Sequence, residues 1–143
     1  MANVKRVLRL ERMDDRYLFR GKRLGNGEWV VGWYAECSLY RGTLTPCIIQ
    51  SELARSGESC YVEVDPSTVS QYTGLTDKHG TKIFEGDILS ENSEHFIVVY
   101  DTKWAKFKLR YTHAIQYPEW NRGVLMEVIG NRWDTPRLMG GEQ

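Results

Sequence analysis

Glu85 and Asp87 lie two residues apart and are the first carboxylates in the chain that suggest a chemical role. Such a pair can hold a divalent cation or supply an acid and a base. The two residues flank Gly86, however, and aspartate next to glycine is typical of a turn. We therefore interpret the pair as structural. A metal-dependent hydrolase or nuclease is the alternative.

Histidine, cysteine and serine give no further catalytic set. The three histidines match no metal-ligand spacing, the cysteines form no C-x-x-C pair, and no serine lies in a nucleophile elbow. These histidines and cysteines are His79, His95, His113, Cys37, Cys47 and Cys60. We expect free thiols in a reducing cytoplasm, no bound metal or cofactor, and no enzymatic activity.

Two groups of basic residues suggest nucleic-acid binding. One is near helical spacing in an N-terminal arm, and the other forms a row on one face of a predicted strand. They are Arg6, Arg9, Arg12 and Arg16 in the arm, and Lys106, Lys108 and Arg110 in the strand. The alternatives, which we favour, are a solvated arm that pairs with acidic groups of its own protein and an edge strand whose charges prevent aggregation.

The overall composition excludes some classes of protein. The formal net charge is zero and the apolar share is ordinary, which argues against a disordered tail protein or a globally basic nucleic-acid coat. Basic residues concentrate in the first 23 residues and acidic residues in 24–99. With no apolar run as long as a membrane span and no signal peptide, we expect a soluble protein of the host cytoplasm.

Alternating apolar residues predict a mainly β fold with little regular helix. Residues 17–34 read as a hairpin around a glycine-rich turn. In the run from Trp29 to Tyr34 both faces are largely apolar, so we expect burial on both sides or a subunit contact. The residues proposed for that contact are Trp29, Val31, Trp33 and Tyr34.

The remaining strands are short and joined by turns. Residues 47–49 and 60–64 should pack with the first hairpin, and Asp65 should start a brief helical turn through residues 66–68. Strands are expected near 83–84, 88–89, 95–100, 106–111 and 124–129, with a turn at 91–94. We predict that residues 83–136 form a small SH3-like barrel.

The stretch from Gln71 to Leu89 organises these elements. Asp77 and Gly80 define one turn, in which the aspartate bonds its own backbone and the glycine takes a positive φ. Residues 85–87 define the next turn. A turn, a short strand, a second turn and a longer strand therefore follow one another with almost no residues between them.

Three segments resemble the YopX family of phage and prophage proteins. They are FRGKRLGNGEWVVGWY at 19–34, VDPSTVSQYTGLTDKHGTKIFEGDIL at 64–89 and EVIGNRWDTPRLM at 127–139. The shared positions that we treat as a structural signature are Gln71, Tyr72, Gly74, Leu75, Asp77, Gly80, Glu85, Gly86, Asp87, Ile129, Gly130 and Asn131. The resemblance implies a small phage-borne protein that forms homo-oligomers, and it supplies no catalytic residues. The arm precedes the family pattern, so no role for it follows from the family.

These observations predict a single domain with four parts. They are an arm at 1–16, a hairpin subdomain at 17–64, a connector at 65–82 and the barrel part at 83–136. We expect a homo-oligomeric binding or assembly module that contacts its own copies or another phage or host protein. The alternative function is nucleic-acid binding through the two basic groups.

Overall fold

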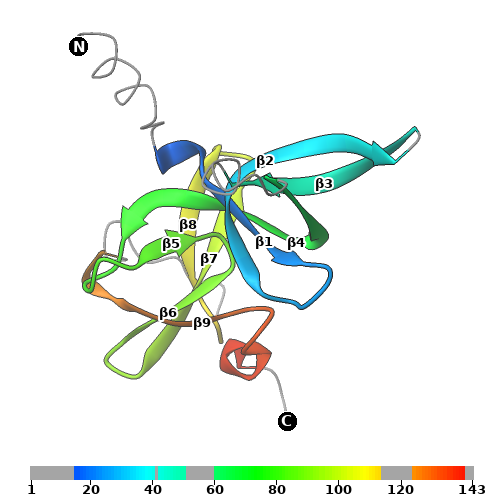
Figure 1. Ribbon diagram of the computed structural model, residues 1–143. Coiled ribbons are helices and arrows are strands. Elements are labelled where there is room, and N and C mark those ends of the chain that lie inside the picture. The colour runs from blue at the N-terminus through cyan, green and yellow to red at the C-terminus, as the bar shows by residue number, and fades with distance from the viewer. Residues whose placement is uncertain (1–14, 41, 51–59, 114–123, 141–143) are drawn as a thin grey trace, which may run out of the picture.

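The computed structural model of the protein describes residues 15–40, 42–50, 60–113 and 124–140. This part is mainly β, as predicted, with short 3-10 turns at η1 (Asp15–Tyr17) and η3 (Pro136–Met139). Its strands are β1 (Phe19–Arg23), β2 (Trp29–Tyr40), β3 (Thr43–Ile49), β4 (Tyr61–Thr76), β5 (Lys82–Phe84), β6 (Asp87–Glu91), β7 (Glu94–Asp101), β8 (Lys106–Tyr111) and β9 (Glu127–Asn131). Figure 1 shows them in two groups.

The first group is a closed antiparallel ring of four strands. β1 pairs with both β2 and β4, while β3 joins β2 to β4, and β5 extends the sheet from the far end of β4. The alternation of each strand sends one set of side chains inward. That set is Val30, Ile48, Val62 and Val64, with Phe19, Tyr34 and Val69 packed around them.

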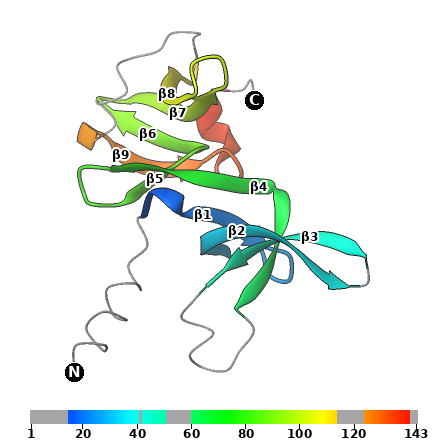
Figure 2. The ribbon, with the colours of Figure 1, turned by 90° about the horizontal axis from the view of Figure 1, so that it is seen from above.

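β4 is longer than the sequence analysis expected, and the predicted helical turn at 66–68 is wrong. The strand runs on through these residues. The Asp65 carboxylate accepts hydrogen bonds from the backbone N–H and hydroxyl of Ser67. The pairing of β1 with β4 shifts register here, because extra residues of β4 form an irregular bulge. β4 bends sharply along its length in Figure 2, and this bend lets one strand serve both the ring and β5.

The second group is a four-stranded antiparallel sheet in the order β8-β7-β6-β9. One of its faces forms a second core from Leu89, Phe96, Val98 and Leu109, closed by Ile83 and Met126. Among the described residues the pairings of this group leave β8 and β9 as edges. The closed ring of strand pairings thus lies at residues 19–76, whereas the described part of 83–136, where an SH3-like barrel was predicted, shows an open sheet. The period of two identified the strands but carries no information on which strands pair.

The turns of the central stretch agree with the sequence analysis. Asp77 is buried, and one of its carboxylate oxygens accepts hydrogen bonds from the backbone N–H groups of His79 and Thr81. Its other oxygen accepts from the backbone N–H of Val128, at the start of β9. Gly80 takes a φ of 82°, which a glycine adopts without strain. Asp77 thus holds its own turn and ties that turn to the last strand.

No helix in the described ranges is long and apolar enough to cross a membrane.

Candidate functional site

The Asp87 carboxylate is fully engaged inside the protein. It is 1% exposed, and one oxygen lies 2.6 Å from a guanidinium nitrogen of Arg20. The other oxygen accepts a hydrogen bond of 2.8 Å from the backbone N–H of Phe84. Burial raises the pKa of Asp87, and the Arg20 charge offsets this in part. These contacts support the structural interpretation of Asp87.

Its neighbour Glu85 lies in a different environment. Burial raises the pKa of Glu85, while the charge of Arg132 acts in the opposite direction. Across the described ranges, no three His, Cys, Asp or Glu side chains gather in an arrangement that suits a metal ion.

Arg20 joins the two groups of strands. From β1, its Nε donates to the hydroxyl of Ser70 on β4, while its terminal nitrogen binds Asp87 on β6. Its guanidinium carbon lies 4.5 Å from the ring centroid of Trp29 and 4.7 Å from that of Phe84. The sequence analysis did not select Arg20, although it lies in the first segment of the family resemblance.

Trp29 takes part in an interaction within the chain. Its indole N–H donates to Asp134 at 2.6 Å, and its ring lies 5.4 Å from that of Trp133. Asp134 also accepts from the amino group of Lys22 and from the side-chain amide of Asn131. Partial burial raises the pKa of Asp134, but these hydrogen bonds outweigh it and lower the pKa to about 2.

The other three proposed contact residues divide between the two faces of β2. Tyr34 faces the interior of the ring, where its ring lies 5.9 Å from that of Phe19. Val31 and Trp33 alternate with it and lie on the outside. The register places Trp33 opposite Ile49 and Ile49 opposite Tyr61, so their side chains share one face. We call Val31, Trp33, Ile49 and Tyr61 the outer ring face.

This outer ring face is apolar and partly open to solvent. Val31 is 40% exposed and Tyr61 45%. The indole N–H of Trp33 is buried, and it finds no hydrogen-bond partner in the structure as described. An unpaired buried donor costs free energy unless another group reaches it.

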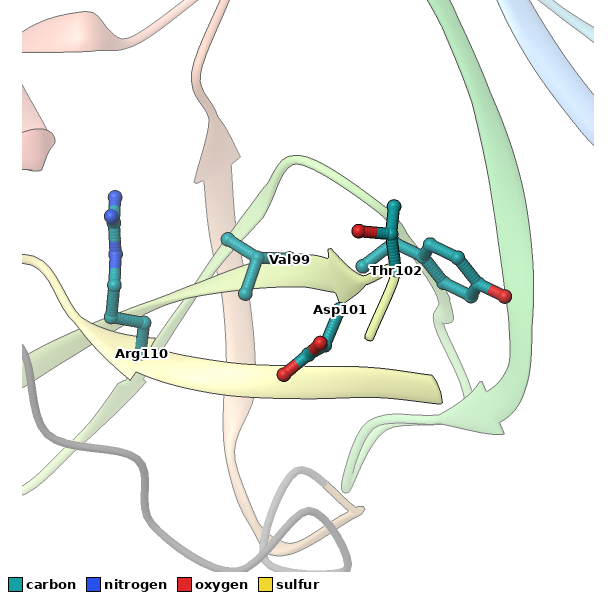
Figure 3. Close-up of a pocket in the computed structure, with 5 residues that line it drawn as sticks. Val99, Asp101, Thr102 and Arg110 are labelled. Carbon is teal, nitrogen blue, oxygen red and sulfur yellow. The ribbon is translucent and has the colours of Figure 1, made fainter. Parts of the chain in front are cut away.

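The row of Lys106, Lys108 and Arg110 lies along β8, which is an edge strand among the described residues, as anticipated. Lys108 forms an ion pair with Asp101 of the neighbouring strand. Arg110 borders an open hollow of about 350 Å³, shown in Figure 3 with Val99 between Arg110 and Asp101. The hollow is also lined by Tyr100 and Thr102. The sequence analysis identified the row but not the hollow.

The arm is mostly outside the described residues, which exclude Arg6, Arg9 and Arg12. Arg16 belongs to η1, which contacts β4, and its guanidinium group donates to the hydroxyl of Tyr17. The prediction of a basic surface on the arm therefore lies outside the described residues, whereas all three residues of the β8 row are described.

The other signature residues make contacts that suit an architectural role. The rings of Tyr72 and Phe84 lie 5.5 Å apart, and the carbonyl of Gln71 accepts from the N–H of Glu85. A Cβ on Gly130 would lie 2.1 Å from the Thr135 hydroxyl, so only glycine fits there. The remaining ones lie in β4, in turns and in β9: Gly74, Leu75, Gly86, Ile129 and Asn131.

The sequence was compared with models of known protein families. The model of a family described as YopX protein matches residues 19–140, which is most of the chain and excludes the N-terminal arm. No curated protein matches the sequence.

Proposed function

The chain belongs to the YopX family, and on that premise we propose that it is a phage or prophage accessory protein that acts as a homo-oligomeric assembly module. The observation that carries this proposal is the outer ring face, where Val31 and Tyr61 are exposed and the Trp33 N–H is buried without a partner. A second subunit packed on this face would cover the apolar atoms.

The proposal uses two of the four contact residues inferred from the sequence. Val31 and Trp33 lie on the outer ring face, whereas Trp29 is bound to Asp134 and Tyr34 packs inside the ring. The proposed function is non-enzymatic and is carried out in the host cytoplasm. The engagement of Asp87 by Arg20 supports the first point, because it occupies the carboxylate that a hydrolase would need.

The test is the assembly mass of the untagged protein by native mass spectrometry. Val31→Lys introduces a charge at an exposed position of the outer ring face, so the variant should fold and should shift the protein toward the monomer. Leu125→Lys is the matched control, because Leu125 is 65% exposed and lies outside that face. A monomeric wild-type protein would refute the function. An oligomer unaffected by Val31→Lys would place the contact elsewhere.

A second candidate function is nucleic-acid binding. The observation that favours it is the position of Arg110 beside the hollow on the β7–β8 face, together with Lys106, which is exposed on the same strand. The arm arginines could add to this surface. Binding of this kind should weaken steeply as salt rises, because it releases counterions from phosphates.

A further inference from the structure

The hollow is positively charged, because Asp101, the one carboxylate among its lining residues, is paired with Lys108 while Arg110 is not paired with an acid in the described part of the chain. Asp101 forms an ion pair with Lys108, and its carboxylate also accepts hydrogen bonds from the backbone N–H groups of Lys103 and Trp104. The hydrogen bond from Lys108 is the main reason why the pKa of Asp101 is lowered. Asp101 is therefore ionised, and its carboxylate already interacts with the Lys108 amino group and with two backbone N–H groups of the turn.

Arg110 keeps its charge available to a ligand. It lies opposite Ile97, on the same face of the sheet as Val99 and Asp101, and it borders the hollow. No acidic side chain in the described ranges forms an ion pair with it. The hollow thus offers a guanidinium group, the apolar side chain of Val99 and the exposed residue Thr102, as Figure 3 shows.

The turn beside the hollow carries an exposed tryptophan. Trp104 is 64% exposed, and its backbone is held by Asp101, which lines the hollow. The amino group of Lys103 lies 5.5 Å from the centroid of its ring. Unpaired bases stack on solvent-facing aromatic rings while their phosphates bind cations nearby, and Trp104 with Lys103 and Arg110 offers both kinds of group.

We propose that this surface of Arg110, Thr102 and Trp104 binds single-stranded nucleic acid. Arg110 holds a backbone phosphate at its end of the hollow, and an unpaired base stacks on Trp104 at the turn. A base within a duplex is already stacked on its neighbours and does not offer its flat face to Trp104. This inference rests on the second candidate function and names its ligand and its site.

The test is fluorescence anisotropy at low salt with a labelled single-stranded oligothymidylate of 12 nucleotides. Arg110→Gln and Trp104→Ala should each weaken binding by about tenfold, the size expected for losing one charge contact or one stacked base. Lys78→Gln is the control, because Lys78 is an exposed cation that pairs with Glu127 away from the hollow. It should bind like the wild-type protein.

Further probes separate folding from binding and one ligand class from another. Arg110→Lys keeps the charge and should retain more affinity than Arg110→Gln, while circular dichroism checks that each variant is folded. A duplex of the same length should bind more weakly than the single strand, and a polyglutamate peptide should not compete with it. Tighter binding of the duplex, or efficient competition by polyglutamate, would overturn the inference in favour of a duplex or an acidic protein segment.

The two levels of the proposal fail in different ways. Absence of binding to any nucleic acid at low salt would remove both the site and the second candidate function. Binding that is unchanged by Arg110→Gln and Trp104→Ala would overturn the site alone and leave the function to other basic residues.

Discussion

Arg20 links the two groups of strands through a buried ion pair with Asp87. Its guanidinium group donates to carboxylate and hydroxyl oxygens while its central carbon lies over the rings of Trp29 and Phe84. Arginine suits such a site because its planar group combines several donors with surfaces that stack on aromatic rings. Lysine offers one compact charge, and it would lose the ring contacts.

Replacing Arg20 by methionine should strongly destabilise the protein. Asp87 would then be a buried carboxylate without its cation, and breaking a buried ion pair in this way costs about 3–5 kcal/mol. Urea unfolding followed by circular dichroism would measure the loss. Lys22→Met is the comparison, because the Lys22–Asp134 pair is more exposed and should contribute no more than about 1 kcal/mol. Equal losses in the two variants would contradict the role given to Arg20.

Asp134 makes a contribution to stability that acid should remove. Its pKa is about 2 in the folded protein, against 3.8 for the free side chain. A carboxylate with a lowered folded pKa stabilises the protein above its unfolded pKa, and this stabilisation fades as the pH falls from about 4 to about 2.

The expected result is a smaller drop in melting temperature between pH 5 and pH 2.5 for Asp134→Asn than for the wild-type protein. Tryptophan fluorescence should report the same change, because the Trp29 N–H donates to Asp134. Identical pH profiles for the two proteins would show that Asp134 does not titrate in this range.

Among the elements, the β6–β7 hairpin shows how sequence fixes a local structure. Two residues connect its strands, and both take positive φ values, 50° at Asn92 and 68° at Ser93. Two-residue hairpin turns favour this geometry because it matches the twist of the strands. Asparagine tolerates a positive φ better than serine does, so the strain is concentrated at Ser93.

Ser93→Gly should therefore stabilise the hairpin. Glycine removes the strain of about 1–2 kcal/mol that a side chain suffers in this conformation, and it loses about 0.5–1 kcal/mol through its greater freedom when unfolded. The net gain is about 0.5–1 kcal/mol, measurable as a higher urea midpoint. Ser90→Gly lies within β6, where no such strain exists, and should lower the midpoint. A lower midpoint for Ser93→Gly would contradict this account.

Elements were predictable where local rules decide the structure. The hairpin turns, the Asp77 turn and the alternation of β8 follow from residue types within a few positions of one another. The path of β4 did not follow, because a proline such as Pro66 usually ends a strand and favours the first turn of a helix. In the structure Ser67 and Thr68 form side-chain hydrogen bonds with Asp65 that hold a bulge, and the strand continues. A side-chain contact thus overrode the usual effect of proline.

For the whole molecule, we expect the two groups of strands to unfold together. Arg20 and Asp87 pair across the junction, and the rings of Trp29 and Trp133 meet 5.4 Å apart. Unfolding followed by tryptophan fluorescence and by far-ultraviolet circular dichroism should give coincident curves with a single midpoint. A fluorescence change that clearly precedes the loss of strand signal would show that the ring and the second sheet separate first.

For the candidate sites, the sequence predicted which residues take part but not how these residues are arranged in space. The row of Lys106, Lys108 and Arg110 was identified because alternation places it on one face. The hollow next to it depends on the β7–β8 turn and on Asp101 binding Lys108. The Arg20–Asp87 pair joins positions 67 residues apart, which no local pattern reveals. The family resemblance identified the regions that meet there, but not the contacts between them.

The position of Trp133 and Asp134 also bears on synthesis by the ribosome. Lys22 and Trp29 leave the ribosome 112 and 105 residues before their shared partner Asp134. The ring can begin to pair once β4 has emerged, while this part of its surface waits for Trp133 and Asp134 to be made. A message cut short before these two codons would yield a protein without the contacts that join β1 and β2 to the segment after β9.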